Sequence, residues 1–206
     1  MLRKLSAFAA IFYIGSCFAA ETDSIGSVVV QGDLWMDGHP VQGSGTVFDG
    51  TWLETGSEPK TISELRLNNG TKITLHRSSS GTVYRGHFVL VRGEAEAAAT
   101  GSYRVEIGGL AIKPSEPRTS ETIAIAPGGD VSVMAQTGQI QIAGTHGQVL
   151  AQIRPQESQA FTRNSGGDWQ IGAASRHAGD HGHDGDKDGH DGDDWDHDHR
   201  HHHHSR

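Results

Sequence analysis

Short runs in which apolar and polar residues alternate recur along this chain, and nearly every run ends at a glycine or proline turn. Such period-two alternation is typical of β-strands with one buried face, whereas an amphipathic helix repeats its apolar residues every three to four positions. With a spacing of about 8 to 12 residues and no strand-helix alternation, the runs predict an all-β fold: a sandwich, a jelly roll or a short β-solenoid. The thirteen predicted strands are residues 25–31, 46–55, 62–67, 71–76, 82–84, 87–91, 103–107, 111–113, 121–126, 131–135, 139–143, 148–153 and 158–162.

The clearest local signal is a hairpin over residues 62–76. Alternating leucines precede Asn69-Gly70, and alternating Ile73 and Leu75 follow it. Asn-Gly accepts the positive φ angles of a tight primed turn, so this turn type is predicted here. A second hairpin-like unit is predicted over residues 131–142, with Gly138 in its turn.

Helix propensity is high in only one place, the alanine-rich run at residues 95–99. Gly93 and Gly101 bracket this run too closely for a stable helix. Gly93 is also predicted to end the strand at residues 87–91. The high glycine count of 28 against 6 prolines, with aromatic residues at only 6%, favours short strands and turns throughout.

The first twenty residues have the features of an export signal. Arg3 and Lys4 provide the positive start, and the apolar run from Leu5 to Ser16 is shorter than the roughly 20 residues of a membrane span. Residues 1–20 are therefore predicted to direct the protein to the periplasm or cell envelope.

Cys17 leaves two alternatives open. In Ile14-Gly15-Ser16-Cys17 it resembles a lipobox cysteine, which would be acylated and would anchor the protein to a membrane; alternatively it is a small residue removed with the signal. Because Cys17 is the only cysteine, no disulfide is expected, and the domain must rely on its apolar core. About 150 residues between the signal and the C-terminal segment suffice for one core.

Several short motifs occur in the order found in one known domain family. Gly50 to Gly56 resembles an entry strand that ends in Thr-Gly, and Asn69-Gly70-Thr71 stands where that family has Asp-Gly-Ser. The run Ile73-Thr74-Leu75, the serines at 78–80 and Leu90-Val91-Arg92-Gly93 follow. In these motifs, residues 26–162 resemble the FecR domain, an all-β periplasmic module of bacterial iron-signalling regulators and of stand-alone envelope proteins.

The resemblance implies a non-enzymatic β domain over residues 24–165 that contacts another envelope protein in a regulatory or sensory role. Signalling members of the family also have a cytoplasmic N-terminal domain and a membrane span before the β domain. Neither precedes the β domain in this sequence. Direct transmembrane control of a sigma factor is therefore not expected.

The segment at residues 176–206 is nearly free of apolar residues and is rich in histidine, aspartate and glycine, so it is predicted to be disordered, with residues 166–175 as a linker. Imidazole with carboxylate and no thiolate suits Zn²⁺, Ni²⁺ or Cu²⁺. The predicted ligands are His177, His181, His183, Asp184, Asp186, Asp188, His190, Asp191, His197, His199, His201, His202, His203 and His204. The alternative is a solubilising acidic tail whose metal affinity is incidental.

Calcium is a weaker match to the same segment. Asp184-Gly185-Asp186-Lys187-Asp188-Gly189 fits the first half of an EF-hand loop. Trp195, however, stands at the twelfth position, where such a loop needs a bidentate glutamate, and no amphipathic helices flank the segment.

The sequence contains no nucleophile elbow, zinc-protease motif or phosphate-binding loop, so no catalytic activity and no required cofactor are predicted. The four remaining histidines, His39, His76, His87 and His146, lie in the predicted β domain with nothing to bring them together. The net charge of −8, or −10 once Arg3 and Lys4 are removed, disfavours nucleic acid as a partner.

Two functions from different classes are consistent with these features. One is an envelope regulatory or adaptor module with a metal-binding tail. The other is a periplasmic buffer or carrier of Zn²⁺, Ni²⁺ or Cu²⁺, in which the tail does the binding and the β domain is a scaffold.

Overall fold

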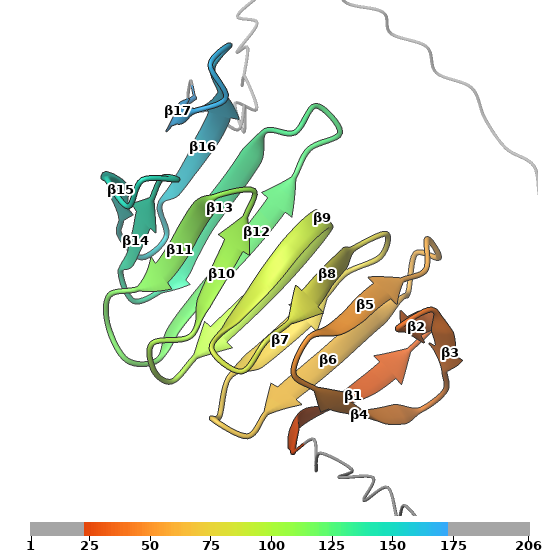
Figure 1. Ribbon diagram of the computed structural model, residues 1–206. Helices are drawn as coiled ribbons and strands as arrows, with labels where there is room; N and C mark the ends of the chain where they lie inside the picture. Colours follow the sequence, from red (N-terminus) through yellow and green to blue (C-terminus); the bar gives the residue numbers. More distant parts are fainter. Residues whose placement is uncertain (1–22, 173–206) are drawn as a thin grey trace, which may run out of the picture. The chain divides into compact units, whose positions relative to one another are not determined.

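The computed structural model describes residues 23–172, which form seventeen strands and no helix (Figure 1). The predicted all-β class is therefore confirmed. The predicted signal, Cys17, the end of the predicted linker and the histidine-rich segment lie outside the described residues. No helix in the described residues is long and apolar enough to cross a membrane.

The strands form two layers, which we call sheet A and sheet B. In hydrogen-bonding order, sheet A contains β4 (Ser44–Phe48), β1 (Ser24–Gln31), β6 (Ile62–Leu67), β7 (Lys72–Leu75), β9 (His87–Ala99), β12 (Thr119–Ile125), β13 (Val131–Thr137), β16 (Ser158–Arg163) and β17 (Trp169–Ile171). Sheet B contains β3 (His39–Val41), β2 (Leu34–Met36), β5 (Thr51–Thr55), β8 (Ser80–Val83), β9 again, β10 (Arg104–Ile107), β11 (Leu110–Pro114), β14 (Ile140–Ala143) and β15 (Val149–Ile153). In Figure 1 sheet A runs from β1 and β4 at the lower right to β16 and β17 at the upper left, and sheet B runs from β2 and β3 at the right to β14 and β15 at the left.

The long strand β9 belongs to both layers and links them into one mixed hydrogen-bonded network. Its first half, from His87 to Arg92, pairs with β8 and β10 in sheet B. Its second half, from Gly93 to Ala99, pairs with β7 and β12 in sheet A. The β9–β10 pairing is parallel, and the other pairings of the described strands are antiparallel.

One continuous apolar core lies between the layers, because strand alternation turns one face of each strand inward. In β6, for example, Leu65 and Leu67 are buried while Glu64 and Arg66 point to the outer face. The largest fully buried side chains come from both sheets and include Phe88 and Phe161.

The chain builds this sandwich by making hairpins alternately in the two layers. Thus β6 and β7 pair in sheet A, β8 and β9 begin in sheet B, and β12 and β13 pair in sheet A. The predicted hairpin over residues 131–142 is wrong for this reason. β13 pairs with β12 and β16, whereas β14 pairs with β11 and β15 in the other sheet.

The hairpin over residues 62–76 is confirmed, but its turn differs from the prediction. The type I′ turn that Asn-Gly favours requires positive φ at both central residues, and in this turn only Gly70, with φ of 85°, has it. The loop is longer: the Gly70 amide donates to Leu67 O at 2.9 Å, and the Leu67 amide donates to Thr71 O at 2.9 Å. The Asn69 side chain contributes by accepting the Thr71 amide, also at 2.9 Å.

Gly93 does not end the strand, contrary to the prediction. Its φ of 83° lets the chain turn from one sheet into the other while remaining extended. Beyond it, Ala95, Ala97 and Ala99 face the core and alternate with more exposed side chains, so a strand forms where intrinsic propensity favours a helix.

Three short strands were missed, and one predicted strand is divided. β2, β3 and β17 have only three residues each, too few to show a clear period. The predicted strand 46–55 is interrupted at Asp49-Gly50, so its parts, β4 and β5, lie in different sheets.

The described part of the predicted linker belongs to the folded body. Trp169 on β17 is buried, and its indole N–H donates to Gly108 O at 3.1 Å. The Arg163 guanidinium packs over the same ring, 4.7 Å from its centroid. The linker prediction is therefore wrong for β17, because a buried tryptophan holds this segment against the rest of the sheet.

Candidate functional site

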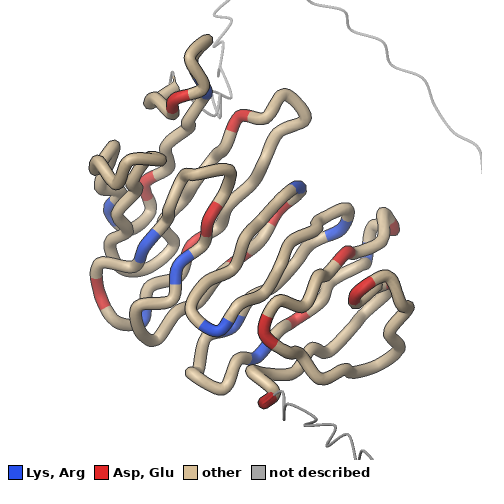
Figure 2. The backbone as a smooth tube through the Cα atoms, in the orientation of Figure 1, with Lys and Arg blue, Asp and Glu red and all other residues tan. Residues whose placement is uncertain are grey.

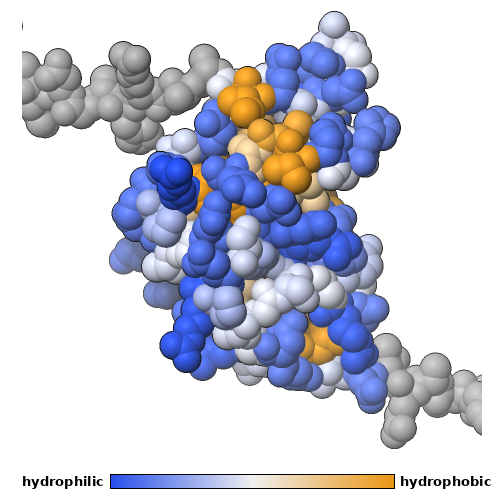
Figure 3. All heavy atoms as spheres, turned by 90° about the vertical axis from the view of Figure 1, so that its left-hand side faces the viewer, coloured by the Kyte–Doolittle hydropathy of each residue, from blue (hydrophilic) through white to orange (hydrophobic). Residues whose placement is uncertain are grey.

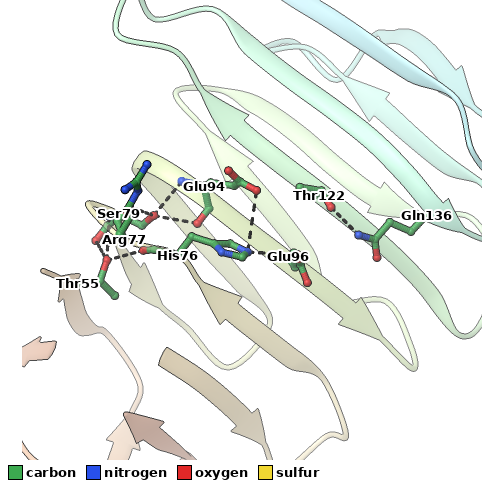
Figure 4. Close-up of polar contacts among 8 residues, drawn as sticks. All are labelled: Thr55, His76, Arg77, Ser79, Glu94, Glu96, Thr122 and Gln136. Atoms are coloured by element: carbon green, nitrogen blue, oxygen red, sulfur yellow. Dashed lines mark hydrogen bonds and ion pairs between the residues drawn. The ribbon is translucent and has the colours of Figure 1, made fainter. Parts of the chain in front are cut away.

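A network of polar side chains lies where β9 crosses between the sheets (Figure 4). His76 follows the last residue of β7, and its amide donates to Glu94 O at 3.1 Å. Its ring projects between two carboxylates of β9: Nε2 is 3.2 Å from Glu96 Oε1 and 4.0 Å from Glu94 Oε1. Strand alternation places Glu94 and Glu96 on the same outer face, so the histidine lies between two acids.

Ser79 anchors the backbone at this crossing. The Ser79 hydroxyl accepts the Glu94 amide at 2.9 Å and donates to Glu94 O, also at 2.9 Å. Ser79 is fully buried, and its own amide donates to Thr55 Oγ1 at 2.9 Å. Thr55 Oγ1 in turn donates to His76 O at 2.6 Å. The hydroxyls therefore hold the backbone, and the Ser79 side chain does not contact the His76 ring.

Replacing Ser79 with alanine should lower the free energy of unfolding by about 1–3 kcal/mol, because the Glu94 amide would lose its partner in a buried position. Urea titration of the two proteins would measure the change. Ser132→Ala on the exposed face of β13 is the control and should change stability by less than about 0.5 kcal/mol. Equal effects of the two substitutions would contradict this role of Ser79.

A shallow depression of about 550 Å³ adjoins the network. His76, Arg77 and Glu94 form its polar wall, and Ile62, Ile125 and Pro127 contribute apolar surface. Such a mixed depression can hold a side chain of a binding partner, and the Arg77 guanidinium offsets the single carboxylate of Glu94.

Further along the outer face of sheet A, Glu64 is paired with two basic side chains. Its carboxylate is 2.5 Å from Lys72 Nζ and 2.7 Å from Arg66 Nε. Hydrogen bonds from Lys72 and then from Arg66 lower the pKa of Glu64. Along the described backbone, residues of positive and negative charge are interspersed (Figure 2).

The structure does not gather the four histidines of the β domain into one site. His39 is exposed on the edge strand β3, and His146 is exposed in the turn after β14. His87 stacks on Tyr84 on the outer face of sheet B. Within residues 23–172, no group of three or more histidine, cysteine or acidic side chains is placed to hold a metal ion. The predicted metal ligands of the C-terminal segment lie outside these residues.

Sequence reasoning missed Glu94, Glu96 and Ser79 as a unit. The signal that was available is the alternation in Glu94-Ala95-Glu96-Ala97, which marks a strand with acids on one face. That His76 lies beside these acids follows from the pairing of β7 with β9, which are separated by β8 along the chain.

Comparison with protein-family models gives no match to this chain, and comparison with curated proteins gives none either.

Proposed function

We propose that this protein is an exported, non-enzymatic β module of the cell envelope. In this proposal the folded body contacts another envelope protein in a regulatory or sensory role, as the FecR-like motifs imply. Residues 176–206 bind divalent transition-metal ions. Attachment to a membrane, if any, is through a lipid on Cys17.

The observation that carries the metal-binding part is the ligand density of the C-terminal segment. Ten histidines and nine aspartates occur in 31 residues, with four basic residues and no cysteine. Neutral imidazole with carboxylate is a ligand set for Zn²⁺, Ni²⁺ or Cu²⁺, and Ca²⁺ is the weaker candidate.

An apolar surface at the C-terminal end of the sandwich supports the partner-binding part. Val149 on β15 and Ile171 on β17 are 53% and 52% exposed. In Figure 3 apolar side chains gather at this end of the body. β15 and β17 are also edge strands of their sheets, and an edge strand with apolar neighbours is a ready surface for a partner to add a strand or pack a side chain.

Deletion of residues 176–206 should abolish uptake of several equivalents of Zn²⁺ or Ni²⁺ and leave the fold intact. Calorimetry at pH 7.5 and far-ultraviolet circular dichroism of the full chain and the truncated chain would measure both properties. Metal uptake should also disappear near pH 5, because protonated imidazoles do not bind metal. Unchanged uptake by the truncated chain would contradict the assignment of metal binding to this segment.

A test for capture of an envelope protein distinguishes the adaptor function from the carrier function. The truncated chain should still retain a partner from envelope extract, and Val149→Asp with Ile171→Asp should lose it at unchanged thermal midpoint. The ligand density of the tail favours the alternative, a metal buffer or carrier with the β domain as its scaffold. That alternative is preferred if metal uptake is confirmed and no specific partner depends on the body.

A further inference from the structure

The outer face of sheet B carries partly exposed aromatic side chains on neighbouring strands. Trp35 on β2, Trp52 on β5 and Tyr84 after β8 are only partly buried. Each side chain points to the outer face of sheet B, because its neighbour in the sequence (Leu34, Leu53 or Val83) faces the core. No packing role in the core accounts for these three rings.

Two of the rings flank a slot. Trp35 lies opposite Glu54 in the β2–β5 register, so Trp52, two residues before Glu54, is the diagonal neighbour of Trp35. Diagonal positions of this kind are about 7–8 Å apart, so both indole rings can reach one bound group. A depression of about 250 Å³ is lined by Trp35, Gly38, Trp52 and Glu54. A Cβ atom added at Gly38 would meet nothing within 4 Å, so the space beside it is open.

The slot is held in shape by the β2–β3 turn. Asp37 and Gly38 have φ of 51° and 79°, as in a two-residue primed turn. Asp37 Oδ1 accepts the Trp52 amide at 2.9 Å, and the Asp37 amide donates to Trp52 O at 3.0 Å. These two hydrogen bonds hold the Trp52 backbone next to the turn.

Polar pairs surround the rings, and their charges are balanced. Arg92 Nη2 is 2.5 Å from Glu54 Oε1, and both side chains are about half exposed, at 55% and 42%. Arg104 Nε is similarly 2.6 Å from Glu106 Oε1. These groups can donate to and accept from hydroxyls, but they exert no strong net attraction on a charged ligand.

We propose that this face binds a carbohydrate chain, with one sugar ring between Trp35 and Trp52. A pyranose ring presents polarised C–H groups on its flat sides, which pack on the negative faces of indole rings, and hydroxyls at its edge, which suit the Glu54–Arg92 pair. The open slot on a broad sheet face fits one unit of a polymer that continues across the sheet toward Tyr84 and His87, whose rings stack 4.6 Å apart. The Asp37 carboxylate beside Trp52 disfavours an anionic sugar, so a neutral sugar is the expected ligand.

Two soluble probes distinguish the sugar classes: the hexamer of β-1,4-linked glucose and the hexamer of β-1,4-linked N-acetylglucosamine. Calorimetry on the full chain should detect binding of at least one of them. The indole ¹⁵N–H signals of Trp35 and Trp52 should shift, and that of the buried Trp169 should not. Trp35→Ala and Trp52→Ala should each weaken binding at least tenfold.

Two further variants test whether weaker binding is caused by a change at the slot or by a general loss of structure. Gly38 lines the depression, and Gly38→Asn tolerates positive φ and adds a side chain at its rim, so it should weaken binding at an unchanged thermal midpoint. Met134→Ala, on the outer face of sheet A, should bind as the wild type does. The proposal is overturned if neither hexamer binds at millimolar concentration, if only a proline-rich peptide shifts the two indole signals, or if Met134→Ala weakens binding as much as Trp52→Ala.

Discussion

Replacing Glu121 with glutamine should remove most of a decline in stability that the wild-type protein shows between about pH 4.5 and pH 8. Glu121 on β12 points into the core between Ala97 and Ala135, is 3% exposed, and has no hydrogen-bond partner for Oε2. Burial away from water raises the pKa of this carboxyl to about 8 from an ordinary value of 4.5.

The sign of the effect follows from proton binding. Between the two pKa values the unfolded chain is ionised while the folded chain keeps its proton, so folding binds a proton and stability falls as the pH rises. The stability contribution is complete below pH 4.5, and the loss is complete above pH 8. At about 1.4 kcal/mol per pH unit from pH 4.5 to about pH 8, the decline is on the order of 5 kcal/mol. The lowered pKa of Glu64 acts in the opposite sense, since its contribution is lost as the pH falls below 4.5.

Urea unfolding from pH 4.5 to pH 9 would measure this dependence in the wild type and in Glu121→Gln. Glu121→Met should also be insensitive to pH and more stable than the wild type at pH 8, because an apolar side chain of similar size needs no partner. Glu94→Gln on the outer face is the matched control and should keep the decline. A wild-type stability that is flat over this range would show that Glu121 does not titrate as a buried acid.

Replacing Gly93 with alanine should destabilise the fold by about 2–5 kcal/mol, from the cost of a left-handed conformation and from overpacking. Gly93 has φ of 83°, and an added Cβ would lie 2.6 Å from Ser79 Cα and 2.8 Å from Ser78 O, in direct collision with the Ser79 side chain as well. Two of the three atoms that the added Cβ would meet belong to the backbone, and backbone atoms cannot shift without a large cost in free energy.

Thermal and urea unfolding would measure the effect. Gly86→Ala is the control, because a Cβ there meets nothing within 4 Å, and its cost should stay within about 0.5 kcal/mol. We expect Gly93→Ala also to weaken the His76–Glu96 contact, which a change in the NMR chemical shifts of the His76 ring would detect. Similar stabilities of the two variants would contradict the view that β9 can change sheets only at a glycine.

Local patterns were a good guide to which residues form strands and which face the core. The alternation at residues 62–76 predicted both a strand pair and its buried leucines, because a strand with one buried face has apolar residues at every second position. The three-residue strands β2, β3 and β17 escaped detection because three residues are too few to show a period, although the Asp37-Gly38 turn that joins β2 to β3 is itself a local hairpin signal.

The polar site and the aromatic slot could not be predicted in the same way. His76 meets Glu96 only because β7 pairs with the second half of β9, and Trp35 approaches Trp52 only because β2 pairs with β5. Neither pairing is between strands that follow one another in the chain. The composition of the site was visible in the sequence, and its assembly was not.

By itself the sequence determined the all-β class, the apolar interior of the strands and the chemical character of the segment at residues 176–206, since each of these follows from residue type and local spacing. Only the tertiary structure decided which strands share a sheet, that β9 continues through Gly93 into the second sheet, and that Glu121 is buried without a partner. The physical reason is that strand pairing depends on how well two distant faces pack and on what one backbone turn permits. Neither condition is contained in any short stretch of residues.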